Sequence, residues 1–190
     1  MKRLSIERFA KSKKVYPAAL LWGFAEATLF FLVPDILLSL AGIKNLKKGY
    51  LALLCSMAGA LLGGSLMYYL GYLNPQQTLN MLENIPAIDH NLIAKVADEL
   101  KEHGIISMFF GPLSGTPYKI YAVLSPVSGI GYLLFALISI PARGIRFLAV
   151  TTIFHYFFKL FFSGCSYKTK IYISLVFWIL FYIFYFSVMP

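Results

Sequence analysis

Long apolar runs alternate with short polar segments along the chain, and three of these runs predict membrane-crossing helices. Residues 49–73 contain no charged residue and end in tyrosines, which suit the membrane interface. About 20 apolar residues are enough to cross the hydrocarbon core of a bilayer. Residues 130–162, with an expected kink at Pro141, and residues 171–189 are the other two candidates.

Two further apolar runs contain prolines that a continuous helix accommodates poorly. Pro34 interrupts residues 17–43, and Pro112 and Pro117 interrupt residues 105–129. Proline removes a backbone donor and clashes with the preceding turn. We therefore expect each run to form a re-entrant helical hairpin, which enters and leaves the membrane on the same side.

Smaller features within these segments give local expectations. The first arm of the first hairpin is expected to reach about Leu32. Gly59 and Gly63 form a GxxxG pair, which predicts the close approach of another helix. Residues 88–103 predict an amphipathic helix at the outer interface, with Asp89 as its N-cap and apolar residues at helical spacing.

The two halves of the chain repeat this order of parts. Each half has a proline-broken hairpin followed by a helix that begins Gly-Tyr-Leu, at 49–51 and at 131–133. One crossing separates the hairpins, so they would enter the membrane from opposite sides. The expected fold class is an all-α integral membrane protein with an inverted repeat of two re-entrant helical hairpins plus spanning helices.

Composition and charge agree with a membrane location and give an orientation. Of 190 residues, 59% are hydrophobic and 17% aromatic, and the formal net charge is +9. Lysine and arginine are concentrated in residues 1–48 and 159–170, whereas 74–104 is mainly acidic. Basic residues mark cytoplasmic loops, so we expect the N-terminus inside and residues 74–104 outside. The protein is expected to be a multi-pass protein of the cell membrane, the inner membrane if bacterial.

One membrane domain accounts for most of the chain. We expect a basic cytoplasmic segment over 1–16, a membrane domain over 17–170 and a C-terminal transmembrane helix over 171–190. No nucleic-acid partner is expected, because no RNA- or DNA-binding motif is visible and the positive-inside pattern explains the same lysines. Cys55 and Cys165 have no nearby partner, which favours two small core residues over a disulfide or a metal site.

Five charged residues lie inside or beside the apolar runs: Glu26, Asp35, Lys119, Arg143 and Arg146. Exposure of a charged side chain to lipid has a high free-energy cost. The five residues are expected to converge on a polar cavity. Structural salt bridges are an equally good explanation for any single residue. The whole set favours function, because apolar residues often replace buried ion pairs without loss of stability.

The residue types suggest separate roles in such a cavity. Arg143 and Arg146 present forked donors that match phosphate oxygens, and Lys119 adds a point charge, so the three could hold an anionic headgroup. Burial disfavours a charged carboxylate, so Glu26 or Asp35 could take up and release a proton. The alternative for Asp35 is to cap the helix after Pro34. We expect no catalytic residue, metal ligand or cofactor.

The order and spacing of five motifs along the chain resemble those of a known protein family. The motifs are Glu26 with Pro34-Asp35, Gly-Tyr at 49 and 131, Glu102-His103-Gly104, Gly-Thr-Pro-Tyr-Lys at 115–119, and Ala-Arg-Gly-Ile-Arg-Phe at 142–147. With them, roughly residues 17–160 resemble the DedA/VTT superfamily (the SNARE-associated Golgi protein group), nearest its YqaA-like branch. The Arg-Phe-x-Pro that often opens the second hairpin of this family reads Phe-Phe-Gly-Pro at 109–112, so its arginine is absent.

The resemblance implies facing re-entrant hairpins and the movement of lipids between leaflets. Its acidic residues would fall on Glu26 and Asp35, its basic hairpin residue on Lys119, and a basic pair downstream on Arg143 and Arg146. Bacterial members are associated with undecaprenyl phosphate recycling or phospholipid translocation, often linked to the proton motive force.

We therefore expect a flippase or scramblase for a phosphate-bearing lipid, with membrane lipids as its partners. We also consider a homodimer. The alternative is a proton-coupled exporter of small ions or drugs. A membrane enzyme such as a lipid phosphatase is disfavoured, because His155 has no evident nucleophile beside it. A structural subunit would tolerate conservative replacement of all five charges.

Overall fold

A computed structural model describes residues 6–188, and all regular structure in them is helical. The all-α prediction is confirmed. Residues 1–5 of the expected basic segment lie outside the described residues. The helices are α1 (Ile6–Lys11), α2 (Val15–Ala27), α3 (Asp35–Gly42), α4 (Leu46–Leu73), α5 (Pro75–Glu83), α6 (His90–His103), α7 (Ile105–Phe110), α8 (Tyr118–Val127), α9 (Tyr132–Phe161) and α10 (Tyr167–Val188), with a 3-10 turn, η1, at Gly111–Leu113.

Helices α4, α9 and α10 are long and apolar enough to cross a membrane, with 28, 30 and 22 residues. This confirms the prediction of three helices long and apolar enough to cross a membrane, although their ends differ from the predicted ones. Helix α4 begins three residues before the predicted start, because the side chain of Asn45 accepts the backbone N–H of Lys48 at 3.1 Å and caps it. Helix α10 begins at Tyr167, so Lys168 and Lys170 belong to its first turn.

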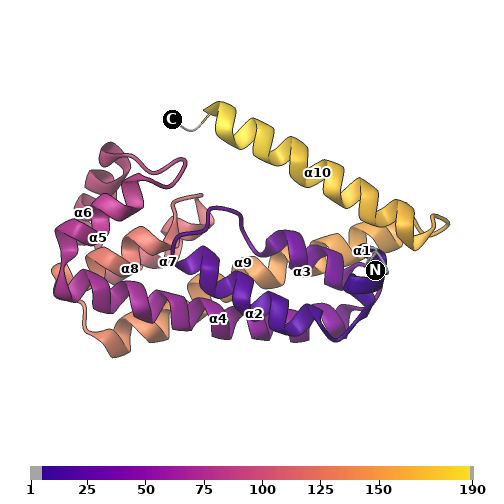
Figure 1. The fold of residues 1–190 in the computed structure, drawn as a ribbon, viewed down its shortest axis with the longest axis horizontal. Helices are drawn as coiled ribbons and strands as arrows, with labels where there is room; N and C mark the ends of the chain where they lie inside the picture. Colours follow the sequence, from indigo (N-terminus) through magenta and orange to yellow (C-terminus); the bar gives the residue numbers. More distant parts are fainter. Residues whose placement is uncertain (1–5, 189–190) are drawn as a thin grey trace, which may run out of the picture.

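Helices α2 and α3 are two short arms joined by a chain reversal. In Figure 1, α2 runs from the end of the molecule that holds the N-terminus to its middle, and α3 returns to that end. The first arm ends at Ala27 rather than near Leu32. The reason is local, since the hydroxyl of Thr28 donates to the carbonyl oxygens of Phe24 and Ala25 at 3.1 and 2.9 Å and closes the last turn.

Pro34 stands directly before α3, where its missing N–H interrupts no helical hydrogen bond. Asp35 is the first residue of this helix, and the N-cap position is taken by Pro34, which has no capping side chain. The capping alternative for Asp35 is therefore wrong. Its carboxylate is bound instead by a side chain of α9, as described below.

Helices α7, η1 and α8 form the second interrupted segment. Gly115 turns the chain at φ +100°, a conformation that favours glycine, and Pro117 immediately precedes α8. The polar region before this segment contains a helix that the sequence pattern did not predict, α5, with Pro75 at its first position. The predicted cap of α6 is confirmed, because Asp89 accepts the N–H of Leu92 at 2.8 Å.

Helix α4 is the element on which both interrupted segments pack, through its glycines. A Cβ at Gly59 would lie 1.9 Å from the carbonyl oxygen of Leu20 in α2, and one at Gly63 would lie 3.0 Å from the Cβ of Ala27. At the next residue, a Cβ on Gly64 would lie 2.3 Å from the Tyr118 hydroxyl, at the start of α8. The close approach predicted from the GxxxG pair is confirmed, and α2 and α8 meet end to end beside residues 63–64.

Basic segments far apart in sequence share one end of the molecule. Lys44, Lys48 and Tyr167 line a common small pocket with Ala10, so the starts of α4 and α10 lie together. This clustering agrees with the expectation that these segments lie on one side of a membrane. The expectation for the cysteines is wrong in part, because Cys55 is half-buried but Cys165 is exposed between α9 and α10.

Candidate functional site

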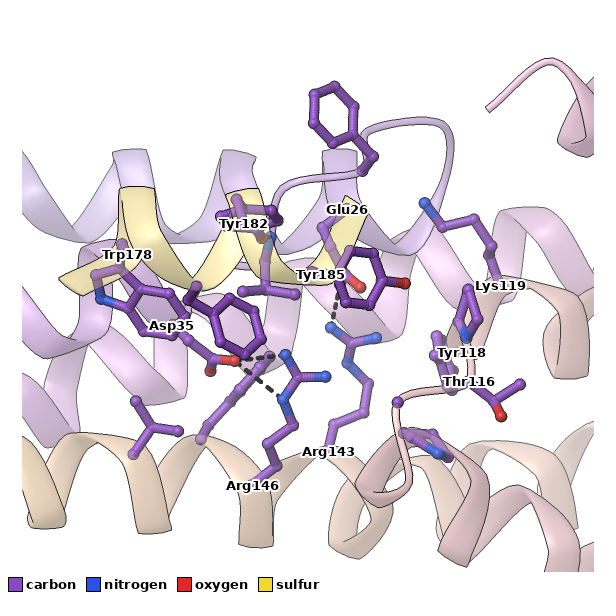
Figure 2. A pocket seen from close by; sticks show the side chains of 18 of the residues that line it. Glu26, Asp35, Thr116, Tyr118, Lys119, Arg143, Arg146, Trp178, Tyr182 and Tyr185 are labelled. Carbon is purple, nitrogen blue, oxygen red and sulfur yellow. Dashed lines mark hydrogen bonds and ion pairs between the residues drawn. The ribbon is translucent and has the colours of Figure 1, made fainter. Parts of the chain in front are cut away.

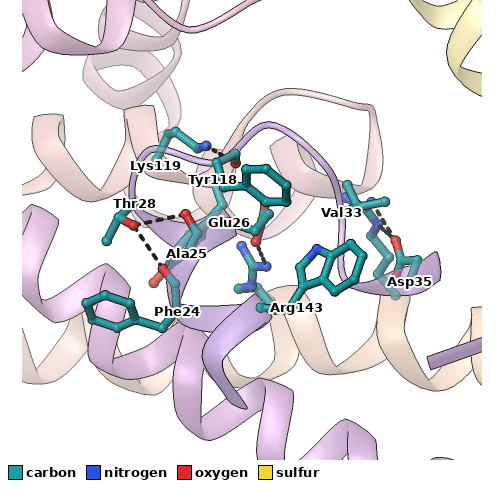
Figure 3. A network of polar contacts seen from close by, with 12 residues as sticks. Phe24, Ala25, Glu26, Thr28, Val33, Asp35, Tyr118, Lys119 and Arg143 are labelled. Carbon is teal, nitrogen blue, oxygen red and sulfur yellow. Dashed lines mark hydrogen bonds and ion pairs between the residues drawn. The ribbon is translucent and has the colours of Figure 1, made fainter. Parts of the chain in front are cut away.

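The ends of the two interrupted segments touch in the middle of the molecule. Lys119 Nζ, in the first turn of α8, donates to the backbone carbonyl oxygen of Phe30 at 2.8 Å (Figure 3). Phe30 lies in the non-helical stretch after α2, where its carbonyl is free to accept. The indole N–H of Trp22 donates to the carbonyl oxygen of Leu32 at 2.9 Å in the same stretch. The chain reversal is therefore held by side chains from two helices.

A cavity of about 400 Å³ lies at this junction. Its wall is built by both chain reversals, the α5–α6 loop, one face of α9 and the second half of α10 (Figure 2). All five charged residues singled out from the sequence line it: Glu26, Asp35, Lys119, Arg143 and Arg146. Pro112 and Pro117 also line it, whereas Pro34 is buried beside Asp35.

Glu26 and Arg143 form the more deeply buried ion pair. Arg143 Nη2 donates to Glu26 Oε2, and the two side chains are 9% and 5% exposed for Glu26 and Arg143. The guanidinium also lies 4.6 Å from the centre of the Tyr118 ring and 5.1 Å from that of Phe147, so two aromatic faces hold it. Arg143 Nε is buried without a hydrogen-bond partner in the described structure.

Asp35 and Arg146 form the second pair, and its arginine is the more accessible. Arg146 Nε and Nη2 both donate to Asp35 Oδ2, at 2.9 and 2.6 Å. The Asp35 side chain is 1% exposed, but that of Arg146 is 30% exposed. Asp35 Oδ1 has no partner among the described residues. A carboxylate oxygen buried in this way is costly unless something donates to it.

Lys119 differs from the arginines because its hydrogen-bond partner is neutral. Its ammonium group meets a backbone carbonyl, and the whole residue is 3% exposed. Three cations and two carboxylates therefore line the same cavity, which leaves one positive charge uncompensated when all five are ionised. Arg143 and Arg146, at i and i+3 on α9, point into the cavity beside each other (Figure 2). The arrangement can attract and hold an anionic group.

The rest of the lining is apolar and aromatic, and much of it comes from α10. Trp178, Phe181, Tyr182 and Tyr185 all line the cavity. Sequence reasoning missed them, because α10 was treated as a plain apolar span. Their spacing of three, four and seven residues from Trp178 is the signal that could have found them, since such residues share one face of a helix.

A resident metal has no evident ligand set here. Among residues 6–188, no three His, Cys, Asp or Glu side chains come together as metal ligands would. His155, considered for an enzyme, lies outside the cavity wall, and its Nδ1 is 2.8 Å from the carbonyl oxygen of Gly42. This contact joins α9 to the end of α3.

The fold and the site define an all-helical protein with three helices long and apolar enough to cross a membrane, and with a charged cavity between interrupted helices. Comparison with known proteins adds one distant relative. An uncharacterized protein of Haemophilus influenzae is 23% identical over 128 residues, which are 67% of this chain and 66% of that protein. No family model and no solved structure matches the chain.

Proposed function

We propose that this protein is a membrane lipid transporter of the flippase or scramblase kind, which moves a phosphate-bearing lipid between leaflets. The observation that carries the proposal is the single cavity in which three cations meet two carboxylates among aromatic walls. Undecaprenyl phosphate and anionic phospholipids have the matching chemistry, a phosphate head on a hydrocarbon tail. The resemblance to the DedA/VTT superfamily points to the same substrates.

The proposed topology makes the α2–α3 and α7–α8 segments re-entrant hairpins of an inverted repeat. Helix α2 has 13 residues and α8 has 10, which at about 1.5 Å per residue is roughly 20 and 15 Å. The hydrocarbon core is about 30 Å thick, so neither helix could cross it alone. Their ends meet beside Gly63 and Gly64 of the spanning helix α4, which supports a site at membrane depth.

Arg146 would be the first residue to bind the phosphate group. It is the most exposed of the three cations, and its fork of donors suits two phosphate oxygens. Lys119 would contribute its uncompensated charge from the facing hairpin. The aromatic face of α10 would receive the start of the hydrocarbon tail, because apolar surface gains by leaving polar surroundings.

The carboxylates of Glu26 and Asp35 would couple lipid binding to protonation. Glu26 and Asp35 already occupy the guanidinium groups that a phosphate would need. A proton on either carboxylate removes its negative charge and weakens its hold on the arginine, so the phosphate can replace it. Proton release then favours the carboxylate again and expels the phosphate. Protonation and lipid binding would in this way be coupled through the same donors.

Arg146→Lys is expected to slow lipid translocation about tenfold. The variant keeps a positive charge for Asp35 but loses the fork, and one hydrogen bond to a charged group is worth about 1.5–3 kcal/mol. The measurement is the rate at which a labelled polyprenyl phosphate, or a labelled phospholipid, changes leaflet in proteoliposomes. Lys101→Ala is the matched control, because Lys101 is 74% exposed on α6, away from the cavity.

Glu26→Gln and Arg146→Ala can be tested in the same lipid-translocation assay. Glu26→Gln should remove the response to an imposed proton gradient, since glutamine cannot titrate. If both variants translocate lipid at the parent rate, the proposed roles are wrong. A substrate-dependent pH change without lipid movement would instead support an exporter of small ions or drugs. Release of inorganic phosphate from the lipid would support an enzyme.

The re-entrant topology predicts which residues share a side of the membrane. In a variant lacking Cys55 and Cys165, single cysteines at Lys13 and Lys44 should both react with a membrane-impermeant maleimide from the cytoplasmic side. A cysteine at Gln77, exposed on α5, should react only from the other side. Labelling of positions 13 and 44 from opposite sides would mean that α2 and α3 together cross the membrane.

A further inference from the structure

We infer that residues 179–188, the second half of α10, form a lateral gate of the cavity, and that Tyr182 latches this gate to the first chain reversal. The gate would open the cavity sideways to the lipid that surrounds α10. The gate is a moving element of the proposed transport function, so a test by lipid translocation rests on that function. A test that measures the distance between two labelled positions does not depend on it.

The burial of α10 falls off along its length. Ile171, Ser174 and Trp178 are buried, and Ile171 packs in one apolar cluster with Leu40 and Phe158. Beyond Trp178, every residue up to Val188 is at least partly exposed. Few buried apolar contacts and much exposed surface are the features of segments that open at low cost. Buried contacts therefore hold residues 167–178 of α10 against the rest of the molecule, whereas residues 179–188 have fewer such contacts and can be displaced more easily.

Trp178 marks the boundary between the two halves. Its indole N–H donates to Ser39 Oγ of α3 at 3.0 Å, and its ring stacks on that of Phe154 of α9 with centroids 5.8 Å apart. The helix is thus tied to both neighbours at this point. Figure 1 shows α10 as the outermost element, crossing the other long helices at an angle.

Two contacts hold the second half in place. The backbone N–H of Val33 donates to the Tyr182 hydroxyl at 2.8 Å, and the ring of Phe31 meets that of Phe186 edge to face at 5.8 Å. Both partners lie in the non-helical stretch between α2 and α3. This backbone N–H has no helical partner, so at membrane depth it needs Tyr182, water or a ligand.

The gate covers the charged part of the cavity. Tyr182 and Tyr185 point into the cavity (Figure 2), and Phe181 also lines it, although its side chain is 40% exposed. Leu180, Ile183 and Phe184, on the other side of the same turns, are more exposed, at 60%, 63% and 67%. Displacement of these turns would remove one wall and leave the other walls intact. The opening would face lipid rather than water, which is the route that an amphipathic ligand needs.

Tyr182 is also placed to link the gate to the ion pairs. Val33, which it holds, is two residues before Asp35, and Asp35 binds Arg146. When the latch opens, the Val33 N–H becomes an unpaired donor two residues before Asp35. We assign Tyr182 the role of a positioning residue, because it acts on the site through this chain reversal.

The first test measures gate opening without any transport. Spin labels at Asn84→Cys and Ser187→Cys, in a chain lacking Cys55 and Cys165, report the distance between the α5–α6 loop and the end of α10. Tyr182→Phe removes only the hydroxyl, so it should raise the population of the long distance about two- to tenfold, as expected for the loss of one hydrogen bond. Tyr172→Phe, an exposed tyrosine on the anchored half, is the matched control. Equal distributions in parent, Tyr182→Phe and Tyr172→Phe would overturn the latch.

The second test locks the gate. Phe31→Cys with Phe186→Cys, bridged by a bifunctional maleimide, should translocate lipid at least about tenfold more slowly than the same unbridged protein. Bridging Tyr50→Cys to Thr152→Cys, which joins α4 to α9 where the parent hydroxyls are 3.2 Å apart, should leave the rate unchanged. A bridged gate that transports at the unbridged rate would refute gating. If the parent moves no lipid at all, the proposed function fails, and the distance measurement still tests the gate.

Discussion

Arg143→Met is expected to lower the free energy of unfolding by about 3–5 kcal/mol, because it leaves the Glu26 carboxylate buried without its partner. The Glu26 side chain is 9% exposed, so water in the cavity would replace the hydrogen bond of the guanidinium but not its charge. Methionine keeps much of the apolar volume between the rings of Tyr118 and Phe147. The measurement is the midpoint and free energy of denaturant unfolding in a mild detergent, followed by helical circular dichroism.

The double variant Glu26→Gln/Arg143→Met separates stability from function. Removal of both charges should recover most of the lost stability, since buried ion pairs are often replaceable by neutral groups. The recovered protein should still fail to transport lipid, because the site has lost one carboxylate and one guanidinium. If the double variant transports at the parent rate, this pair is structural and the anion site lies at Arg146 and Lys119 alone.

Gly59→Ala is expected to destabilise the protein by about 3 kcal/mol, at the upper end of the usual cost of overpacking. The new Cβ would lie 1.9 Å from the carbonyl oxygen of Leu20, and backbone cannot rotate away as a side chain can. Helices α2 and α4 would have to separate. Because Glu26 is carried on α2, the variant should also weaken its contact with Arg143, and the same unfolding assay would detect the loss.

Gly164→Ala is the matched control for this variant. Gly164 lies in the α9–α10 loop, and a Cβ there would meet nothing within 4 Å. Its unfolding free energy should stay within about 0.5 kcal/mol of the parent, as for an ordinary surface change. Equal unfolding free energies for the Gly59 and Gly164 variants would show that the α2–α4 contact does not contribute to stability as its geometry indicates.

Arg143→Met and Gly59→Ala both disturb the way in which α2, α4 and α9 pack together. The glycine face of α4 lets α2 approach closely enough for Glu26 to reach Arg143 on α9, and the next glycine, Gly64, admits Tyr118. Tyr118 in turn holds the Arg143 guanidinium against its ring and hydrogen bonds to Ser139 at 2.7 Å. Glycines of the long apolar helix α4 therefore help to place the charged groups of the cavity, although they line none of it themselves.

The amino-acid sequence by itself predicted the all-helical fold, the three helices long and apolar enough to cross a membrane, and the charged residues of the cavity. These are local properties, since an apolar run of sufficient length predicts a span and a charge within such a run is conspicuous. It also indicated that Pro34 and Pro117 stand where helices are interrupted. It misplaced the end of the first arm, because the hydroxyl of Thr28 closes α2 before the proline is reached.

Only the tertiary structure decided the partners. Glu26 pairs with Arg143, 117 residues away, and Asp35 with Arg146, 111 residues away. No periodicity within one helix specifies which of two carboxylates meets which of two arginines, because that choice depends on how α2, α3 and α9 pack on α4. The contribution of α10 to the cavity has the same cause. Its aromatic face is visible in the sequence, but the wall that it forms exists only where the helices come together.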